Sequence, residues 1–417
     1  MSFRKKPLVV FVILLFISSF SNIITTLIPK TVGQIDNNVN PAIDSIYWLK
    51  LGKIGPTSST KIYMGFASPS KNLFNKVDVG EAPTLSGKYG EYDDAQNVFT
   101  YYTNFSSLGG WQYNLSKGSL AANNGLVIDF NGPGYMVTKA TYGPGTAFVA
   151  YVNSIGDLDN VGYFDLDEPV NGHTGWAGSF IRLACGNTYP DQWNSSAEAN
   201  GCGSPFGYFV NAEGIGGTYE VQILNSTSSV DDLNFKQSAI INRDYPIYPA
   251  NVGFDGQFNP ISIQWAFVMR LPPQGIMPSV SISPYASSIS SLGIVAPTGI
   301  SYAVPVTITN SQGVSTSSVY QQLLAVNSSL YSSYEASNLQ NVEFFYSNGT
   351  VIPSWLQTGN SNHAGIIDSL TVRVYPTENS YLYINGTYEA LSNGNYTISD
   401  IPYATHYNVF VENPNYE

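Results

Sequence analysis

Charged residues are scarce in this 417-residue chain, at 11% of the total, against about 25% in an ordinary soluble protein. Ser, Thr, Asn, Gly and 30 tyrosines stand in place of the missing charges. Because carboxylates lose their charge in acid, a fold that depends little on them suffers less from acid denaturation. The composition therefore fits a protein secreted into an acidic habitat. The net charge of −12, with no basic cluster in the folded part, argues against nucleic acid as a partner.

Histidine and cysteine are nearly absent, which argues against several kinds of site. The three histidines, His173, His363 and His406, are scattered in loop-like contexts, and no G-x-S-x-G motif is present. A zinc site needs clustered His or Cys, and the sequence has none. The two cysteines, Cys185 and Cys202, are predicted to close a polar loop by a disulfide in an oxidising compartment. The alternative is two unrelated thiols.

The N-terminus carries a targeting signal. The basic stretch "MSFRKK" precedes the apolar run "PLVVFVILLFISSF", which is the pattern of a secretory signal peptide. The continuation "SNIITTLIP" extends the segment to about 20 residues, enough to span a bilayer. No clean cleavage site is present, so residues 1–30 are either a cleaved signal or a retained membrane anchor. In both cases the remainder is predicted to face outward, at the cell surface or secreted.

Eight N-x-[ST] sequons agree with export and are candidate glycosylation sites. They are Asn104, Asn114, Asn194, Asn225, Asn327, Asn348, Asn385 and Asn395.

Helical periodicity is also scarce. Short alternating runs such as "GTAFVAYV" and "ISIQWAFVMRL" recur between Gly, Pro and Asn clusters, which predicts an all-β chain of β-sandwiches. The stretch "SIYWLKLGKIGPTSSTKIYMGF" is predicted to form a β-hairpin. Residues 272–300, rich in Pro, Ser and Gly, are predicted to be a linker or a long surface crossing.

Several long motifs resemble a known family. "SIYWLKLGKIGPTSSTKIYMGF" and "GEAPTLSGKYGEYDDAQNVF", within residues 43–100, resemble the second half of a domain of unknown function in archaeal surface proteins. "YAVPVTITNSQG" and "VIPSWLQTGNSN", within residues 301–365, resemble its first half. Residues 101–271 resemble the concanavalin-A-like (laminin-G-like) jelly rolls of that family. Residues 366–417, with "YLYING", resemble a PEGA-type β-module. The resemblance implies a cell-surface β-protein.

The two halves stand in the reverse of the family's order. The apolar "IYWLKL" strand is therefore predicted to pair with strands between Ser301 and Trp355. The chain closes on itself as a circular permutant, or each subunit donates strands to its neighbour and a ring or filament forms. High effective concentration favours closure within one chain.

An acidic stretch, "GDLDNVGYFDLDEP", supports three interpretations. On a strand, Asp165 and Asp167 point to one face roughly 7 Å apart, which superficially resembles the E-x-D-x-E strand of concanavalin-A-like glucanases. In that case Asp165, Asp167 and Glu168 are weak candidates for glycoside hydrolysis. The second interpretation is calcium, bound by hard oxygen donors. Its candidate ligands are Asp157, Asp159, Asn160, Asp165 and Asp167. The third is turn chemistry, with Asp side chains bonded to their own backbone.

Aromatic residues in or beside loop-like stretches are candidates for stacking on sugars. They are Trp111, Tyr113, Trp176, Tyr189 and Trp193. The alternative for each is a place in a sandwich core, which is the prediction for Trp48, Trp265 and Trp355.

Together these observations predict an exported, non-catalytic, lectin-like protein that binds glycans or other surface proteins and needs no cofactor. The alternatives are a structural subunit that self-assembles by strand exchange and, with the weakest support, a glycoside hydrolase.

Overall fold

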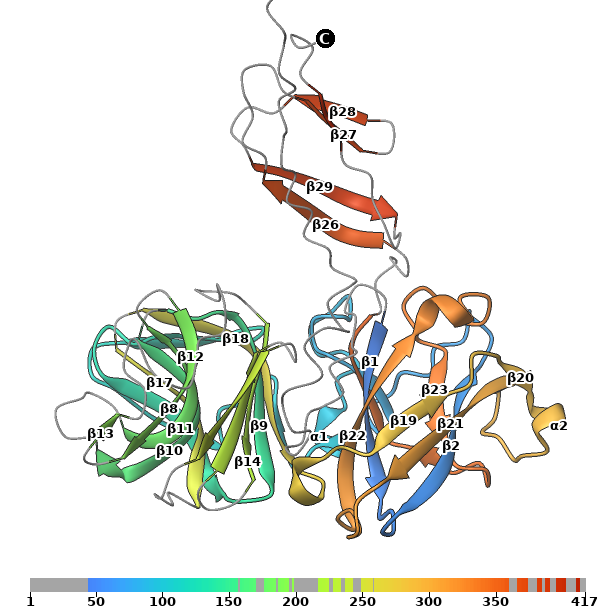
Figure 1. Cartoon of the computed structure of the whole chain (residues 1–417), viewed down its shortest axis with the longest axis horizontal. Helices are drawn as coiled ribbons and strands as arrows, with labels where there is room; N and C mark the ends of the chain where they lie inside the picture. The colour runs from blue at the N-terminus through green and yellow to red at the C-terminus, as the bar shows by residue number, and fades with distance from the viewer. Residues whose placement is uncertain are drawn as a thin grey trace, which may run out of the picture. The chain divides into compact units, whose positions relative to one another are not determined.

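The computed structural model describes residues 44–156, 158–169, 176–184, 187–194, 197–198, 217–224, 228–233, 237–242, 249–257 and 259–359, and five strands beyond them. The chain divides into two compact units, residues 32–362 and residues 1–31 with 363–417. Strands predominate throughout the described part, so the all-β prediction is confirmed (Figure 1). Among the described residues, no helix is long and apolar enough to cross a membrane. The predicted signal segment and both cysteines lie outside these residues.

The larger unit contains two β-sandwiches. The first, here called the split sandwich, is built from both ends of the unit. One of its sheets has the order β22-β1-β25-β3, with bounds Val319–Asn327, Asp44–Gly52, Ser354–Thr358 and Val79–Glu81. The other has the order β19-β21-β2-β23-β24, with β20 also on β21. Its strands are Ser279–Ile282, Tyr302–Asn310, Ser58–Phe66, Val342–Phe345, Val351–Ile352 and Ser287–Ser288.

The apolar strand β1 has neighbours on both sides. Trp48 lies opposite Leu323 of β22 and opposite Trp355 of β25, both in antiparallel register. The predicted pairing of "IYWLKL" with the second half is therefore confirmed, and it occurs within one chain. The predicted hairpin is wrong, because β1 and β2 belong to different sheets. Leu49 faces the interior of the split sandwich while Trp48 faces the second sandwich, so the centre of β1 is buried on both faces and is apolar on both.

The second sandwich is a jelly roll inserted between the halves of the first. Its seven-stranded sheet has the order β13-β12-β11-β10-β17-β8-β5. The bounds are Ala197–Glu198, Asn187–Asn194, Trp176–Ala184, Asp159–Pro169, Ala250–Gly256, Gly134–Tyr142 and Trp111–Leu115. Its eight-stranded sheet has the order β16-β15-β14-β9-β18-β7-β6, with β4 on β18. The bounds are Gln237–Asn242, Ser228–Leu233, Gly217–Ile223, Thr146–Ser154, Pro260–Arg270, Leu126–Asp129, Ser119–Ala122 and Tyr101–Thr103.

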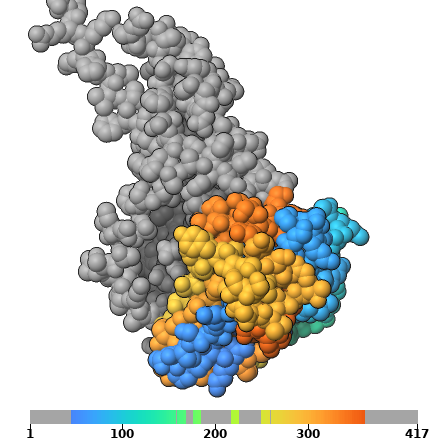
Figure 2. All heavy atoms as spheres, turned by 90° about the vertical axis from the view of Figure 1, so that its right-hand side faces the viewer, coloured from blue at the N-terminus to red at the C-terminus, as the bar shows by residue number. Residues whose placement is uncertain are grey.

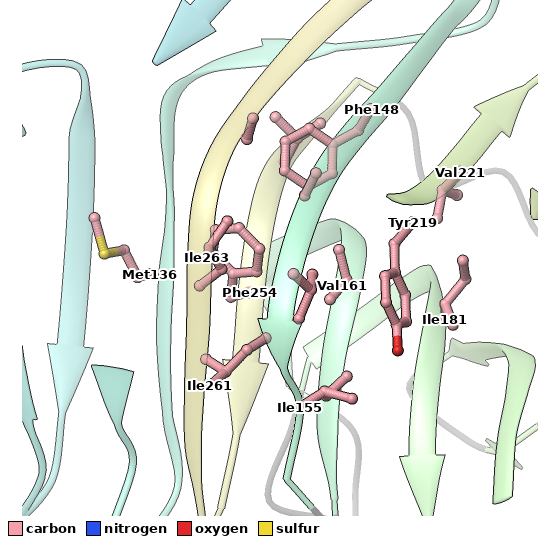
Figure 3. Close-up of a cluster of buried hydrophobic side chains, with 14 of the residues drawn as sticks. Met136, Phe148, Ile155, Val161, Ile181, Tyr219, Val221, Phe254, Ile261 and Ile263 are labelled. Carbon is pink, nitrogen blue, oxygen red and sulfur yellow. The ribbon is translucent and has the colours of Figure 1, made fainter. Parts of the chain in front are cut away.

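The jelly-roll core lies between these two sheets. Phe148, Val161 and Phe254 are fully buried in it and come from β9, β10 and β17 (Figure 3). Alternate residues of the same strands face the other way, as the two-residue period of a strand requires. Each sheet therefore also has an outer face, which points away from the jelly-roll core.

The outer face of the eight-stranded sheet packs against the split sandwich. Trp48, Trp265 and Trp355 meet there, with ring centroids of Trp265 and Trp355 5.2 Å apart and edge to face. The prediction that these three tryptophans are core residues is confirmed. The Gln321 side chain accepts from Arg270 N and donates to Val98 O, which adds polar contacts between the sandwiches. The seven-stranded sheet is the sheet of the jelly roll that does not supply residues to this cluster.

Residues 272–300 are part of the split sandwich rather than a linker. They contain β19 and β20, which both pair with β21, because the alternating "SVSI" suits a strand despite the surrounding Pro and Gly. The short helices of the larger unit are α1 (Ala95–Val98), α2 (Ile289–Leu292), η1 (Pro273–Gly275) and η2 (Ser328–Tyr331).

The smaller unit, described by itself, contains two antiparallel sheets. In one, β26 (Ile366–Arg373) pairs with β29 (Asn395–Pro402). In the other, β27 (Tyr381–Ile384) lies between β28 (Thr387–Ala390) and β30 (Phe410–Glu412).

Candidate functional site

A row of polar residues crosses the outer face of the seven-stranded sheet. Asn160 of β10 lies opposite Arg182 of β11 and Asp255 of β17, and Asp255 lies opposite Tyr135 of β8. Residues in register share a face. The next residues along, such as Phe254, point into the core, so this row faces outward. We call Arg182, Asn160, Asp255 and Tyr135 the polar row.

The centre of the polar row is buried but incompletely hydrogen-bonded. Asn160 and Asp255 are each 2% exposed and Arg182 is 6% exposed. Asn160 Nδ2 donates to Asp255 Oδ1. Among the described atoms, Asn160 Oδ1 and Asp255 Oδ2 accept no hydrogen bond. Each buried acceptor without a partner costs about 1–3 kcal/mol, so two of them in one pair call for a further partner, such as an ordered water or a ligand group.

Burial gives Asp255 an unusual titration. Loss of water around the carboxyl raises its pKa to about 7, although the amide of Asn160, the charge of Arg182 and the backbone of Trp176 act in the opposite direction. Near neutral pH the carboxyl is therefore present in both forms. In its protonated form it can donate one hydrogen bond and accept others, as a sugar hydroxyl does.

Three aromatic residues outside the row lie on the same side of the sheet. Trp176, at the start of β11, is half-buried and contacts Tyr135 edge to face, with centroids 4.8 Å apart. Its backbone also donates to the Asp255 carboxyl, so the indole is tied to the polar row. Phe164 and Phe180 stack on the same face, 5.5 Å apart, and are fully buried. The site thus joins hydrogen-bonding groups with aromatic planes.

The structure separates the predicted sugar-binding aromatics. Trp111 is 3% exposed and stacks on Phe254, so its assignment to sugar binding is wrong: it lies on the core-facing side of β5. Tyr113 is 57% exposed, but its register opposite the core residue Met136 places it on the side of the sheet away from the polar row. Trp176 lies at the site. Tyr189 and Trp193 lie in β12, opposite Arg182 and Gly178 in register, and their side chains are outside the described residues.

The predicted carboxylate pair forms a turn. Asp167 N donates to Asp165 Oδ1 at 3.0 Å, where the pairing of β10 with β11 shifts register between Asp165 and Pro169. The regular strand on which the hydrolase interpretation depends is broken here. The geometry instead matches the turn interpretation. The side chain of Glu168 lies outside the described residues.

The predicted calcium ligands do not form one site. Asp159 and Asp165 are six residues apart on β10, which is about 20 Å along a strand. Asp159 Oδ2 accepts from Gly156 N at 3.0 Å, while the neighbouring Asn160 side chain is bonded to Asp255. Asp167 is exposed beyond the register shift, and Asp157 is outside the described residues. In the part of the chain that the structure describes, no three His, Cys, Asp or Glu side chains are grouped to hold a metal.

Sequence reasoning missed Asp255, Arg182 and Tyr135. A local signal existed for two of them, since "GFDGQ" and "SFIRLA" each place one charged residue within an otherwise apolar strand. A charge in a buried strand needs a partner or a function. The local sequence could not show that these residues lie in one row, because Asn160 and Asp255 are 95 residues apart.

The described sequons differ in accessibility. Asn104 is half-buried and its Nδ2 donates to Asp93 Oδ2 at 2.8 Å. Asn114 and Asn348 are exposed, and Asn327 is half-buried beside η2. The side chains of the remaining four, and both cysteines, lie outside the described residues. They are Asn194, Asn225, Asn385 and Asn395.

Comparison with known proteins adds a likeness of fold. No protein-family model matches the chain, and no curated protein matches it. Several solved structures do. A β-glucanase of Bacillus licheniformis is 12% identical over 40% of this chain and 95% of its own, with a TM-score of 0.30. A legume lectin-like domain from Entamoeba histolytica is 14% identical over 39% and 90%, with a TM-score of 0.29. The VIP36 exoplasmic/lumenal domain, bound to Ca²⁺ and Man3GlcNAc, is 12% identical over 40% and 85%, with a TM-score of 0.31.

Proposed function

We propose that this protein binds glycans on the outer face of the seven-stranded sheet and catalyses no reaction there. The observation that carries the proposal is the buried Asn160–Asp255 pair, which has two unused acceptors and lies beside the Trp176 and Tyr135 rings. A sugar ring matches both features, because its hydroxyls donate hydrogen bonds and its C–H faces stack on aromatic planes. The surrounding apolar surface strengthens such bonds by keeping water out.

Binding rather than hydrolysis is favoured by the number of carboxylates. Glycoside hydrolysis generally needs two carboxyl groups on either side of the scissile bond. In the described part of the polar row there is one, that of Asp255, while Asp165 is engaged in its turn. A single carboxyl held by Asn160 and Trp176 is suited to orienting a hydroxyl.

The proposed location is the cell surface of an archaeon, reached by export. The basic and apolar N-terminus, the low charge, and the resemblance to archaeal surface proteins support it. Exposed sequons at Asn114 and Asn348 are consistent with it. The closed pairing of β1 supports a role as a self-contained binder, because its sheet needs no strand from a neighbouring subunit.

The test is a glycan array followed by calorimetry on the best glycan. Trp176→Ala removes the half-buried ring and is expected to weaken binding by about tenfold or more, corresponding to about 1.4 kcal/mol. Tyr113→Ala is the matched control, because it removes an exposed aromatic ring from the other side of the same sheet. Its affinity should stay within about twofold of the unmodified chain. A chain that binds no glycan, or equal loss in both variants, would refute the proposal.

A further inference from the structure

The split sandwich contains a long stretch without charge. Between Arg270 and Glu335 the sequence has no Asp, Glu, Lys, Arg or His. Even for a chain with 11% charged residues this is a long interval, and it includes four strands, β19, β20, β21 and β22. A surface built from it has no ionic means of attracting a charged ligand.

Exposed apolar side chains concentrate on the same stretch. Among the described residues, nine large apolar side chains are exposed, and six belong to it. The six are Tyr285, Val295, Tyr302, Val314, Val319 and Leu330. Tyr285, at 78%, is the most exposed of the nine. Figure 2 shows the segment that carries β19, β20 and α2, in yellow, facing outward on this side of the molecule. Of the six, Tyr285 and Tyr302 lie on segments that the pairing of β20 with β21 brings together, and exposed apolar side chains that gather in one place are typical of an interaction surface.

The tyrosine rings on this surface pack against rings of the buried core. The Tyr302 ring lies 5.0 Å from that of Tyr334, and Tyr334 stacks on Phe66, centroid to centroid 5.7 Å. Phe66 is 1% exposed, so the chain of rings runs from the interior to the surface. Rings fixed in this way lose little conformational entropy when a ligand stacks on them.

The segment that carries Tyr285 is tied to the same rings. It connects β19 with β20, which pair with β21, and Ser288 lies opposite Tyr302. Tyr331 Oη donates to Ser283 O, and Tyr331 contacts Phe66. The Ser283 hydroxyl bonds the backbone of Tyr285. Tyr285, Tyr302 and Tyr334 with the neighbouring serines are here called the tyrosine surface.

We infer that the tyrosine surface is a second carbohydrate-binding site, specific for neutral glycans. Tyrosine offers an apolar face and a hydroxyl together, and the adjoining side chains are serines, a residue type depleted at protein interfaces. The stretch itself carries no charge with which to attract acidic polysaccharides or nucleic acids. This site is separate from the polar row, so the chain is bivalent, and two linked sites raise the overall affinity for a long glycan.

The experiment is calorimetric titration of the full chain with cellohexaose, mannohexaose and chitohexaose, with heparin hexasaccharide as the charged comparison. It is done in the unmodified chain and in Trp176→Ala, so that the two sites are told apart. The double substitution Tyr285→Ala/Tyr302→Ala is then made in both of these backgrounds and measured in the same way. Val314→Ala/Val319→Ala is the matched control, because it removes two exposed apolar side chains from the same uncharged stretch.

At least one neutral hexasaccharide should bind the Trp176→Ala chain, and the tyrosine pair of substitutions should weaken that binding about tenfold or more, with the valine pair within about twofold. Binding to Trp176→Ala with no loss on Tyr285→Ala/Tyr302→Ala overturns the inference, as does equal binding of heparin hexasaccharide. Complete loss of binding in Trp176→Ala alone also overturns it and leaves the first site standing. A change of solution mass without a change in sugar binding would show a surface for self-association, which contradicts it.

Discussion

Stability should fall as pH rises from 5 to 8, and Glu335 should account for a large part of the effect. Glu335 N donates to Tyr331 O at the end of η2, and burial raises the pKa of the Glu335 carboxyl to about 8 despite a hydrogen bond from Ser328. Its Oε1 has no hydrogen-bond partner among the described residues. The folded chain therefore keeps the Glu335 proton up to about pH 8, whereas the unfolded chain releases it near the ordinary 4.5. Because the folded state binds more protons in this window, raising the pH through it destabilises the fold.

The magnitude follows from the two pKa values. One pKa unit corresponds to about 1.4 kcal/mol, so between pH 5 and pH 8 this single group should remove about 3–4 kcal/mol from the free energy of unfolding. That is a large share of the roughly 5–15 kcal/mol typical of a domain. Burial also raises the pKa of Glu343 and of Asp255, each to about 7, which adds to the slope in the same direction. Such a fold is suited to an acidic habitat.

The assay is urea unfolding followed by tryptophan fluorescence at pH 5 and pH 8. The unmodified chain should be less stable at pH 8. In Glu335→Gln, which cannot ionise, the difference between the two pH values should shrink by about 3 kcal/mol. Glu91→Gln is the control, since Glu91 is exposed and its removal should leave the difference unchanged. A pH dependence identical in Glu335→Gln and the unmodified chain, or a stability that rises with pH, would refute the reasoning.

Three further predictions concern packing, modification and assembly. Gly80→Ala would place a Cβ 2.0 Å from Asp94 Oδ1, so it should cost about 2–4 kcal/mol and lower the melting temperature. Gly87→Ala, with no atom within 4 Å, should not, and equal losses would count against the packing described. In a glycosylating host, peptide mapping should find a glycan on the exposed Asn114 and none on the half-buried Asn104, whose amide is bonded to the half-buried Asp93; occupancy at Asn104 would contradict this. Light scattering should find a monomer at all concentrations, because β1 is paired within its own chain; a ladder of multiples would point to strand exchange.

The sequence predicted the features that local pattern encodes. Alternating Val, Ile, Tyr and Phe indicated strands, and the largely apolar "IYWLKL" indicated a strand with neighbours beside it, as β1 has. Trp48, Trp265 and Trp355 were recognisable as core because each lies within such a strand. The partner of β1 was also predictable, although that inference came from a resemblance between two distant segments and not from periodicity.

Only the tertiary structure decided which residues share a face. The "IYWLKL" and "STKIYMGF" strands look like a hairpin because they are adjacent in sequence. In the structure they pair with different strands and belong to different sheets. Trp111 and Trp176 look alike in the sequence, and strand register sends the first into the core and the second to the site. Asn160 and Asp255 meet across 95 residues because β10 and β17 pair. Periodicity says that a strand has two faces, whereas the pairing of strands far apart in the chain determines what each face meets.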